Sequence, residues 1–267
     1  MRELLKKIPH ESEAPKDRVD YMLCLALDVG EGMLKNGAEI HRVEDTVDRL
    51  CRAYGAVHVE IFAIPSVIIA AVRMSDGKYS SQIRRVKNCT NNMFMVEQYN
   101  KISRTACNDI PELEELDGMI RNVKKKKPYP YAIVVCGAAL ATGAFALFFG
   151  GTWRDAIVVS LIGALMCLGE KIPTSGMNDL AKIAIQSFMA GVLANVFVLI
   201  GIGENPDKIM MGTIMYSIPG LATGIAFRDL LYGDFLAGSL KIIQTCLVAL
   251  MIAFGYFLSM LAFRGVM

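Results

Sequence analysis

The stretch Lys124–Tyr131, KKKKPYPY, decides the fold, because a charged part of the chain ends there and an almost uncharged part begins. The chain has 28 Lys and Arg and 26 Asp and Glu, and 40 of these charged residues precede Pro128. Lysine resists translocation and is held at the anionic cytoplasmic face of a membrane. The lysine run therefore predicts a cytoplasmic amino-terminal part followed by a membrane part. A solvated charge run in a soluble linker is the alternative.

Length and cysteine usage narrow the class further. The 267 residues exceed one typical domain. The seven cysteines are scattered without a CxxC pair, so we expect no disulfide, no metal site and no cofactor. The first residues lack the apolar core of a secretory signal, and membrane insertion is expected to begin after Lys127. No nucleic-acid partner is expected.

Residues 1–127 are expected to form a cytoplasmic α+β domain, and residues 128–267 an all-α membrane domain. Residues 1–16 read as a loose polar tail. Helical periodicity then predicts a helix pair, and a change to period two after Gly55 predicts three antiparallel strands that end near Val86. Two further helices complete the domain. The four predicted helices are Arg18–Lys35, Ala38–Tyr54, Asn92–Asn108 and Pro111–Val123, the last with proline in its first turn.

Five segments of the membrane part are candidate spans, each tested against the ~20 apolar residues that a crossing needs. The second segment is short, and could be tilted, broken or re-entrant. An odd number of spans places the carboxyl terminus outside, in a multi-pass protein of the cytoplasmic membrane. The predicted spans are Tyr131–Gly151, Ala156–Gly169, Ile183–Gly203, Ile209–Phe227 and Ile242–Phe263.

Pro219 and Gly220 lie in the middle of the fourth predicted span. Proline removes a helix hydrogen bond and glycine lets the backbone unwind, a pattern typical of the broken helices of transporters. Gly220 and Gly224 also have GxxxG spacing, which helix packing would equally explain. Polar residues within the spans, among them Gln186 and Asn195, are candidate substrate-pathway residues, although each could instead join two helices.

The topology collects charged residues at the cytoplasmic ends of the later spans, where they could line a vestibule or could be ordinary loop charges. Arg228 is the best candidate to meet a carboxylate-bearing solute, because guanidinium pairs with that group through two hydrogen bonds. The acidic candidates of this pathway are Asp179, Asp229 and Asp234.

The soluble segment Asn36–Leu50, NGAEIHRVEDTVDRL, gathers carboxylates, an imidazole and a guanidinium within a few helical turns. An enzyme would use Glu39 or His41 as acid or base and Ser66 as nucleophile or ligand. A capped, ion-paired surface helix is the favoured alternative, since no known catalytic motif accompanies the segment. We assign no catalytic residue. The motif residues that we single out are Gly37, Glu39, Arg42, Glu44, Thr46 and Ser66.

This soluble motif, together with the membrane stretch Ile218–Lys241, IPGLATGIAFRDLLYGDFLAGSLK, resembles the threonine/serine exporter family. The resemblance covers the chain from Asp17 onward. It implies a secondary exporter of small carboxylate-bearing metabolites, either amino acids such as threonine and serine or dicarboxylates such as succinate. Single-chain members of the family have about twice as many spans. The chain therefore resembles the larger half of a split exporter, which a small membrane partner subunit would complete.

Two functions remain open from the sequence. The first is a transporter subunit in the lipid bilayer, as a heteromer or homo-oligomer, whose soluble domain gates or regulates the pore. The second is a membrane-anchored cytosolic enzyme, hydrolase-like, that uses the Asn36–Thr46 motif. Five spans with a broken helix favour the transporter, because an anchor needs only one span.

Overall fold

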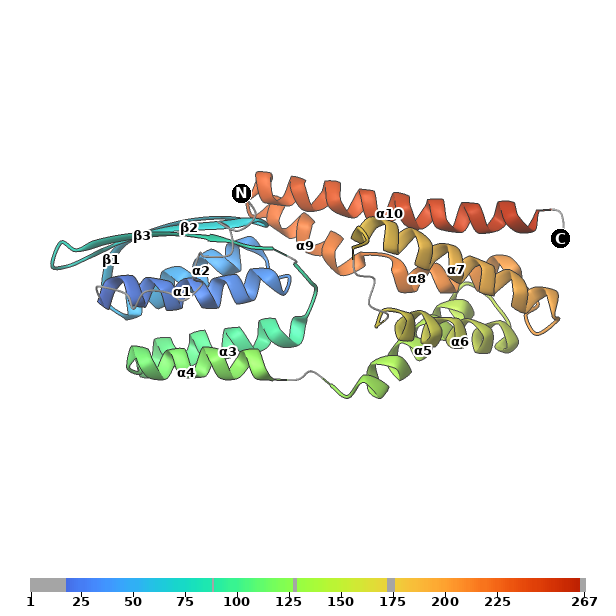
Figure 1. Ribbon diagram of the computed structural model, residues 1–267, viewed down its shortest axis with the longest axis horizontal. Coiled ribbons are helices and arrows are strands. Elements are labelled where there is room, and N and C mark those ends of the chain that lie inside the picture. Colours follow the sequence, from blue (N-terminus) through green and yellow to red (C-terminus); the bar gives the residue numbers. More distant parts are fainter. Residues whose placement is uncertain (1–17, 88, 127–128, 172–175, 265–267) are drawn as a thin grey trace, which may run out of the picture. The chain divides into compact units, whose positions relative to one another are not determined.

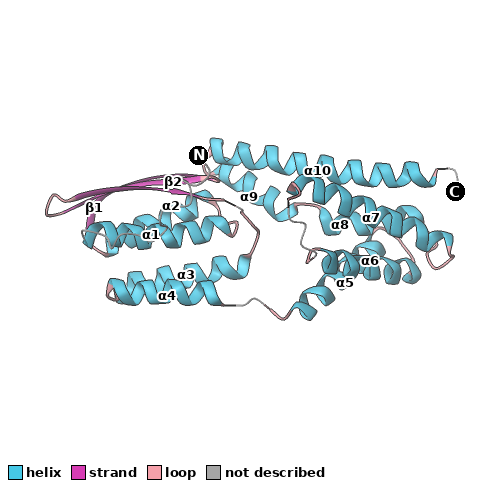
Figure 2. Ribbon diagram, viewed as in Figure 1, coloured by secondary structure: helices cyan, strands magenta, loops and turns pink. Residues whose placement is uncertain are grey.

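The structure is a computed structural model that describes residues 18–87, 89–126, 129–171 and 176–264. It is mostly helical with one small antiparallel sheet (Figures 1 and 2). The chain divides into two compact units. The first unit comprises residues 1–127 and 224–241, and the second comprises residues 128–223 and 242–267. The first unit thus includes a late segment that the sequence assigns to the membrane part. The predicted tail and part of the lysine run lie outside the described residues.

The helices α1 (Arg18–Lys35) and α2 (Ile40–Ala53) begin the first unit, where periodicity predicts them. Their apolar side chains recur at helical spacing and are buried. Gly37 ends α1 by adopting a φ of 89°. The Gly37 amide donates to the Leu34 carbonyl and the Ala38 amide to the Met33 carbonyl, which is the hydrogen-bond pattern of a Schellman motif.

Three strands, β1 (Ala56–Ile64), β2 (Val67–Met74) and β3 (Tyr79–Arg85), form the predicted antiparallel sheet in the order β1-β2-β3. α1 packs on β2 and β3, and α2 packs on β1. One face of the sheet is therefore covered, and Ile68 of β2 is fully buried there. Ile69, the next residue along the strand, points to the other face and is exposed.

The helices α3 (Met93–Asp109) and α4 (Leu113–Lys125) complete the amino-terminal part of the first unit. α3 begins as predicted, with the Asn92 side chain accepting a hydrogen bond from the Met95 amide. The expected position of proline in the first turn of the next helix is wrong. α4 begins only at Leu113, after Glu112 in an extended N-cap conformation, so Pro111 lies before the helix.

The second unit contains α5 (Tyr131–Phe148), α6 (Trp153–Gly169), α7 (Asp179–Leu199), α8 (Pro206–Ser217) and most of α10 (Phe235–Phe263). Contacts link α5 to α6 and α8, and α7 to α6 and α8. The buried Asp155 joins two loops of this unit, because its carboxylate accepts hydrogen bonds from the amides of Thr152, Glu204 and Asn205. Asp155 is therefore a structural residue.

Three helices in the described part of the chain, α5, α7 and α10, are long and apolar enough to cross a membrane. α8 and α9 (Gly220–Leu231) make a fourth candidate if the pair counts as one span, bent by 54°. The predicted break at Pro219 is confirmed, because the residues between the two helices are Ile218 and Pro219. α6 has 17 residues, at the lower limit for a crossing. The count of five spans remains a prediction.

The last predicted span starts too late in the sequence. α10 begins at Phe235, seven residues before Ile242, so Lys241 lies inside a helix instead of in a loop. The turn before it is short because Gly233 adopts a φ of 95° and the Asp234 amide donates to the Asp229 carbonyl. α9 and α10 are consequently joined by a tight turn of only three residues, 232–234.

Candidate functional site

Four charged residues of the first unit, Glu39, Arg228, Asp229 and Lys241, form what we call the charged cluster. Glu39 stands at the N-cap of α2, Arg228 and Asp229 lie in the last turn of α9, and Lys241 lies in α10. The sequence singles out three of the four, but in two separate sites. The structure brings these two sites together, since residues 224–241 belong to the first unit.

Arg228 and Glu39 form an ion pair, with 2.6 Å between Nη1 of Arg228 and Oε1 of Glu39. The two side chains have unequal surroundings, because that of Glu39 is only 11% exposed and that of Arg228 is 66% exposed. Glu39 has an extended backbone typical of an N-cap, yet its carboxylate does not cap α2. It is instead committed to the guanidinium of α9.

Asp229 supplies the capping bond that Glu39 does not make. Its Oδ1 accepts a hydrogen bond from the Ile40 amide at 3.0 Å, across 189 residues of sequence. The first amides of a helix lack partners within it and carry partial positive charge, so a carboxylate is favourable there. Asp229 Oδ2 accepts a second bond from Lys241 Nζ at 2.6 Å. Asp229 is completely buried, so the Lys241 ammonium compensates a charge that water cannot reach.

An open hollow of about 340 Å³ lies beside the ion pair, lined by Glu39, Arg228, Leu231 and Tyr232. We call it the Arg228 hollow. The Tyr232 ring stacks on the His41 imidazole, with 4.8 Å between ring centroids and 9° between planes. This contact, which no sequence pattern indicates, joins the amino-terminal end of α2 to the turn after α9. The hollow therefore combines both signs of charge with an aromatic wall.

Asp234 lies in the turn between α9 and α10. Burial raises the pKa of its carboxyl above the ordinary value, and the nearby Asp229 charge adds to the shift, whereas His41 and Lys241 oppose it. The fully buried Asp229, in contrast, accepts hydrogen bonds from the Lys241 ammonium and the Ile40 amide. The surroundings of Asp234 therefore favour the protonated form of its carboxyl.

The remaining motif residues of α2 and its surroundings are structural or exposed. The Glu44 carboxylate accepts a hydrogen bond from the Ala63 amide at 2.7 Å, which attaches α2 to β1. Burial raises the pKa of Glu44, although the Ala63 amide opposes this shift. Thr46 is buried. Arg42 is exposed on α2, and Ser66 is exposed in the turn between β1 and β2.

The catalytic alternative gains no support from these contacts. Glu39 is paired with Arg228, and His41 stacks on Tyr232. Asp45, which lies one turn from His41, instead pairs with Arg49 at 2.8 Å. Across the described residues, no group of three or more His, Cys, Asp or Glu side chains could hold a metal ion. The amino-terminal end of α2 is therefore occupied by contacts to α9 and to the turn that follows α9.

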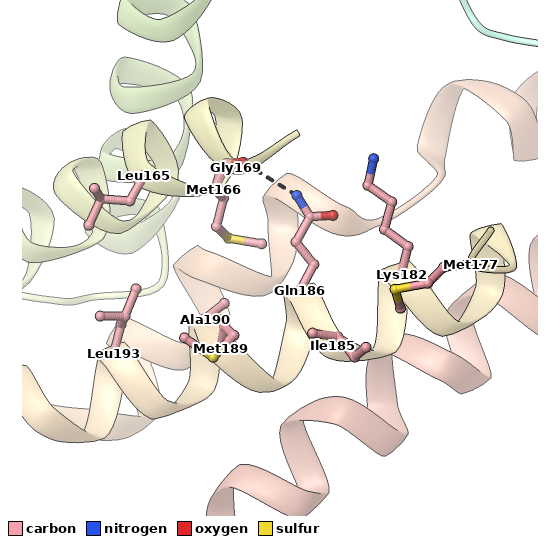
Figure 3. Close-up of a pocket in the computed structure, with 10 residues that line it drawn as sticks. All are labelled: Leu165, Met166, Gly169, Met177, Lys182, Ile185, Gln186, Met189, Ala190 and Leu193. Carbon is pink, nitrogen blue, oxygen red and sulfur yellow. Dashed lines mark hydrogen bonds between the residues drawn. The ribbon is translucent and has the colours of Figure 1, made fainter. Parts of the chain in front are cut away.

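Two of the predicted pathway residues line pockets of the second unit. Gln186 of α7 donates from Nε2 to the Met166 carbonyl of α6 at 3.3 Å and lines an apolar pocket of about 310 Å³ between these helices (Figure 3). Asn195 lines a larger pocket of about 590 Å³, with Asp207 and Arg264 among its other residues. Asn195 is 2% exposed, and its Nδ2 has no hydrogen-bond partner among the described residues. Both pockets contain polar groups that a solute could use.

The other predicted pathway residues lie at helix ends. Asp179 is exposed in the first turn of α7. At the break before α9, the Pro219 carbonyl accepts hydrogen bonds from the Thr223 amide and hydroxyl, at 3.0 Å and 2.8 Å. A Cβ added to Gly220 or Gly224 would meet no described atom within 4 Å. Within the described chain these glycines are therefore not sites of close helix packing.

Helix α9 thus has a break before its first residue and carries part of the charged cluster in its last turn, in a chain whose described part has three helices long and apolar enough to cross a membrane. Residues 24–263 match the family model described as "Putative threonine/serine exporter". The match covers nearly the whole chain, so the protein belongs to the threonine/serine exporter family, as the resemblance of its motifs predicts. A search of curated proteins and a search of solved structures found no match.

Proposed function

We propose that the protein is a subunit of a secondary transporter that exports small carboxylate-bearing metabolites across the cytoplasmic membrane. Threonine and serine are the first candidates because of the family, and dicarboxylates such as succinate are the second. The observation that carries the proposal is the position of α9 between the break and the charged cluster. This helix follows the Pro219 break, and its last turn supplies Arg228 and Asp229 to Glu39 and the first amide of α2.

The charged cluster acts as the gate in this proposal. A change in the bend at Pro219 moves α9, and any movement of its last turn must break or carry along the contacts to Glu39 and Ile40. The soluble part thereby senses the state of the membrane helices. The pathway itself runs past Gln186 and Asn195, whose amides offer hydrogen bonds inside the apolar second unit.

Pro219→Ala tests the proposal. Alanine restores the amide and the continuous helix that proline prevents, so export should fall to near background while the protein still inserts in the membrane. The measurement is efflux of labelled threonine, serine and succinate from preloaded cells or vesicles. Pro9→Ala, a proline before the first described helix, is the control and should export normally. Undiminished export by Pro219→Ala would show that the break does not serve transport.

The orientation is part of the same proposal. Four lysines before α5 hold residues 1–127 inside, and five spans, with α6 crossing as the second, put Met267 outside. Reporter fusions at Lys127, Gly151, Gly176, Asn205, Gly233 and Met267 should alternate between the two sides. Equal location of the Gly151 and Gly176 fusions would show that α6 does not cross.

A further inference from the structure

We propose that the Arg228 hollow is the solute-receiving site, and that the solute which it accepts is a zwitterionic amino acid that inserts between Arg228 and Glu39. The inference rests on the proposed export function and goes further, because it chooses between amino acids and dicarboxylates. In this arrangement the Glu39–Arg228 ion pair closes the empty site, and the solute replaces each partner with a group of the same charge.

The size and walls of the hollow suit such a solute. A water molecule takes about 30 Å³ in the liquid, so the hollow of about 340 Å³ has room for a small amino acid. Leu231 and Tyr232 are both largely exposed and offer apolar contact to a short side chain. The stacking of Tyr232 on His41 fixes one wall before the solute arrives.

Arg228 is the group that can change partner. Its side chain is 66% exposed, so water can solvate the guanidinium when it leaves Glu39. Guanidinium binds a carboxylate through two parallel hydrogen bonds. For Arg228 itself, a solute carboxylate can therefore take the place of Glu39 at little cost.

Glu39 is the group that sets the selectivity. Its side chain is only 11% exposed, and a buried carboxylate that loses its cation is strongly unfavourable. A solute that takes Arg228 away must therefore offer Glu39 a positive charge. An α-amino acid carries its ammonium one atom from its carboxylate and meets this need. A dicarboxylate brings a second negative charge towards Glu39 and is rejected.

Equilibrium binding to the purified full-length chain in detergent tests this selectivity. We expect labelled L-threonine to bind and L-serine to compete with it. Succinate, threonine methyl ester and N-acetylthreonine should compete at least about tenfold more weakly, because each lacks one of the two required charges. Competition by succinate as strong as that by serine would overturn the proposal.

Glu39→Gln gives the more specific result, because it removes the negative charge and keeps the shape of the side chain. Threonine affinity should fall about tenfold or more while succinate affinity rises, so that the preference of the site is lost or reversed. Arg228→Gln should weaken both ligands. An unchanged threonine-to-succinate preference in Glu39→Gln would place the binding site elsewhere.

Matched controls separate loss of binding from loss of folding. Arg18 and Glu112 form an exposed ion pair in the same unit, and Glu112→Gln should leave binding unchanged. Glu39→Asp retains the negative charge, so it should keep the preference for threonine. This variant keeps the proposal testable if Glu39→Gln is misfolded. If the proposed export function is wrong, cells should show no efflux although threonine binding is intact. If this inference is wrong, cells should show efflux, and substitution of Glu39 should not change threonine binding.

Discussion

At the scale of one residue, the contacts of Asp229 predict that the charged cluster contributes to the stability of the fold. It is completely buried and binds the Ile40 amide and the Lys241 ammonium. Asp229→Asn keeps the shape and can still accept from Ile40, but leaves Lys241, whose side chain is 16% exposed, without its counter-charge. We expect a loss of about 3–5 kcal/mol, as for other broken buried pairs. The measurement is thermal or denaturant unfolding of the purified chain.

The companion variant is Asp229→Asn with Lys241→Met. It removes both charges, so stability should recover relative to Asp229→Asn alone, since an apolar replacement of a buried pair is often tolerated. A double variant that is less stable than Asp229→Asn would mean that the pair itself, and not the unpaired ammonium, determines stability.

Asp234 makes an opposite contribution at the same scale. Burial raises its folded-state pKa, so the ionised carboxylate costs stability above that pKa, and the cost disappears as the pH falls through it. Asp234→Asn should therefore stabilise the chain at pH 7 and make no difference at acidic pH, below the ordinary Asp value. Melting temperatures of the two proteins across this pH range check the expectation. A variant that is less stable at pH 7 would show that the Asp234 charge has a stabilising partner.

Single residues were the most predictable part of the site, and their pairing was the least. Glu39 and Arg228 stand out in the sequence because charged groups beside apolar stretches are costly. Their contact joins positions 189 residues apart, and neither helical period nor strand alternation carries information over that separation. The sequence did not predict Lys241 as a partner, since a lysine at the start of an apolar run is typical of a loop charge. It did not predict a role for Tyr232 either.

Helices, strands and breaks were predictable from the sequence wherever local backbone and side-chain preferences alone determine them. The break at Pro219 was predictable because proline removes a backbone donor wherever it stands. The sheet was predictable from its period of two. Residues 235–241, about the first two turns of α10, were missed because tertiary contacts decide where the helix starts, namely the Gly233 turn and the Asp229–Lys241 pair.

Gly37 offers a test at the scale of the element, because it ends α1 and leads into Glu39. Its φ of 89° is unfavourable for any residue with a Cβ, by about 1–2 kcal/mol. A Cβ there would also lie 2.7 Å from Asn91 Oδ1 and 3.0 Å from the Thr90 carbonyl oxygen. Gly37→Ala should therefore destabilise the chain by more than the backbone term, as measured by unfolding.

Gly77 is the matched control for this prediction. It has a φ of 84°, but a Cβ at this position meets nothing within 4 Å. Gly77→Ala should show the backbone cost alone. Equal losses in the two variants would mean that the chain around Thr90 and Asn91 moves aside without cost.

At the scale of the whole molecule, the membrane helices bury little of their surface within the chain. The apolar windows of α5, α7 and α10 are 17%, 28% and 22% buried. Lipid can cover such surfaces, but Asn195 lines a pocket of about 590 Å³ in the same unit, and its Nδ2 has no hydrogen-bond partner in the described part of the chain. In an apolar phase an amide without a partner is costly. The second unit alone is therefore a poor candidate for a complete pathway.

We accordingly expect export to require a small membrane partner subunit. Cells that produce this chain alone should show background efflux of threonine. Cells that also produce a small protein with several apolar spans, encoded beside it, should show efflux, and the two proteins should purify together.

Asn195→Leu is a second test of the same prediction, because leucine has a similar size and no amide. The variant should insert in the membrane and bind the partner normally but export less, since the partner completes the hydrogen bonding that this pocket lacks. Full export by the single chain in vesicles that contain no other protein would contradict the prediction and assign the whole pathway to this chain or to its homo-oligomer.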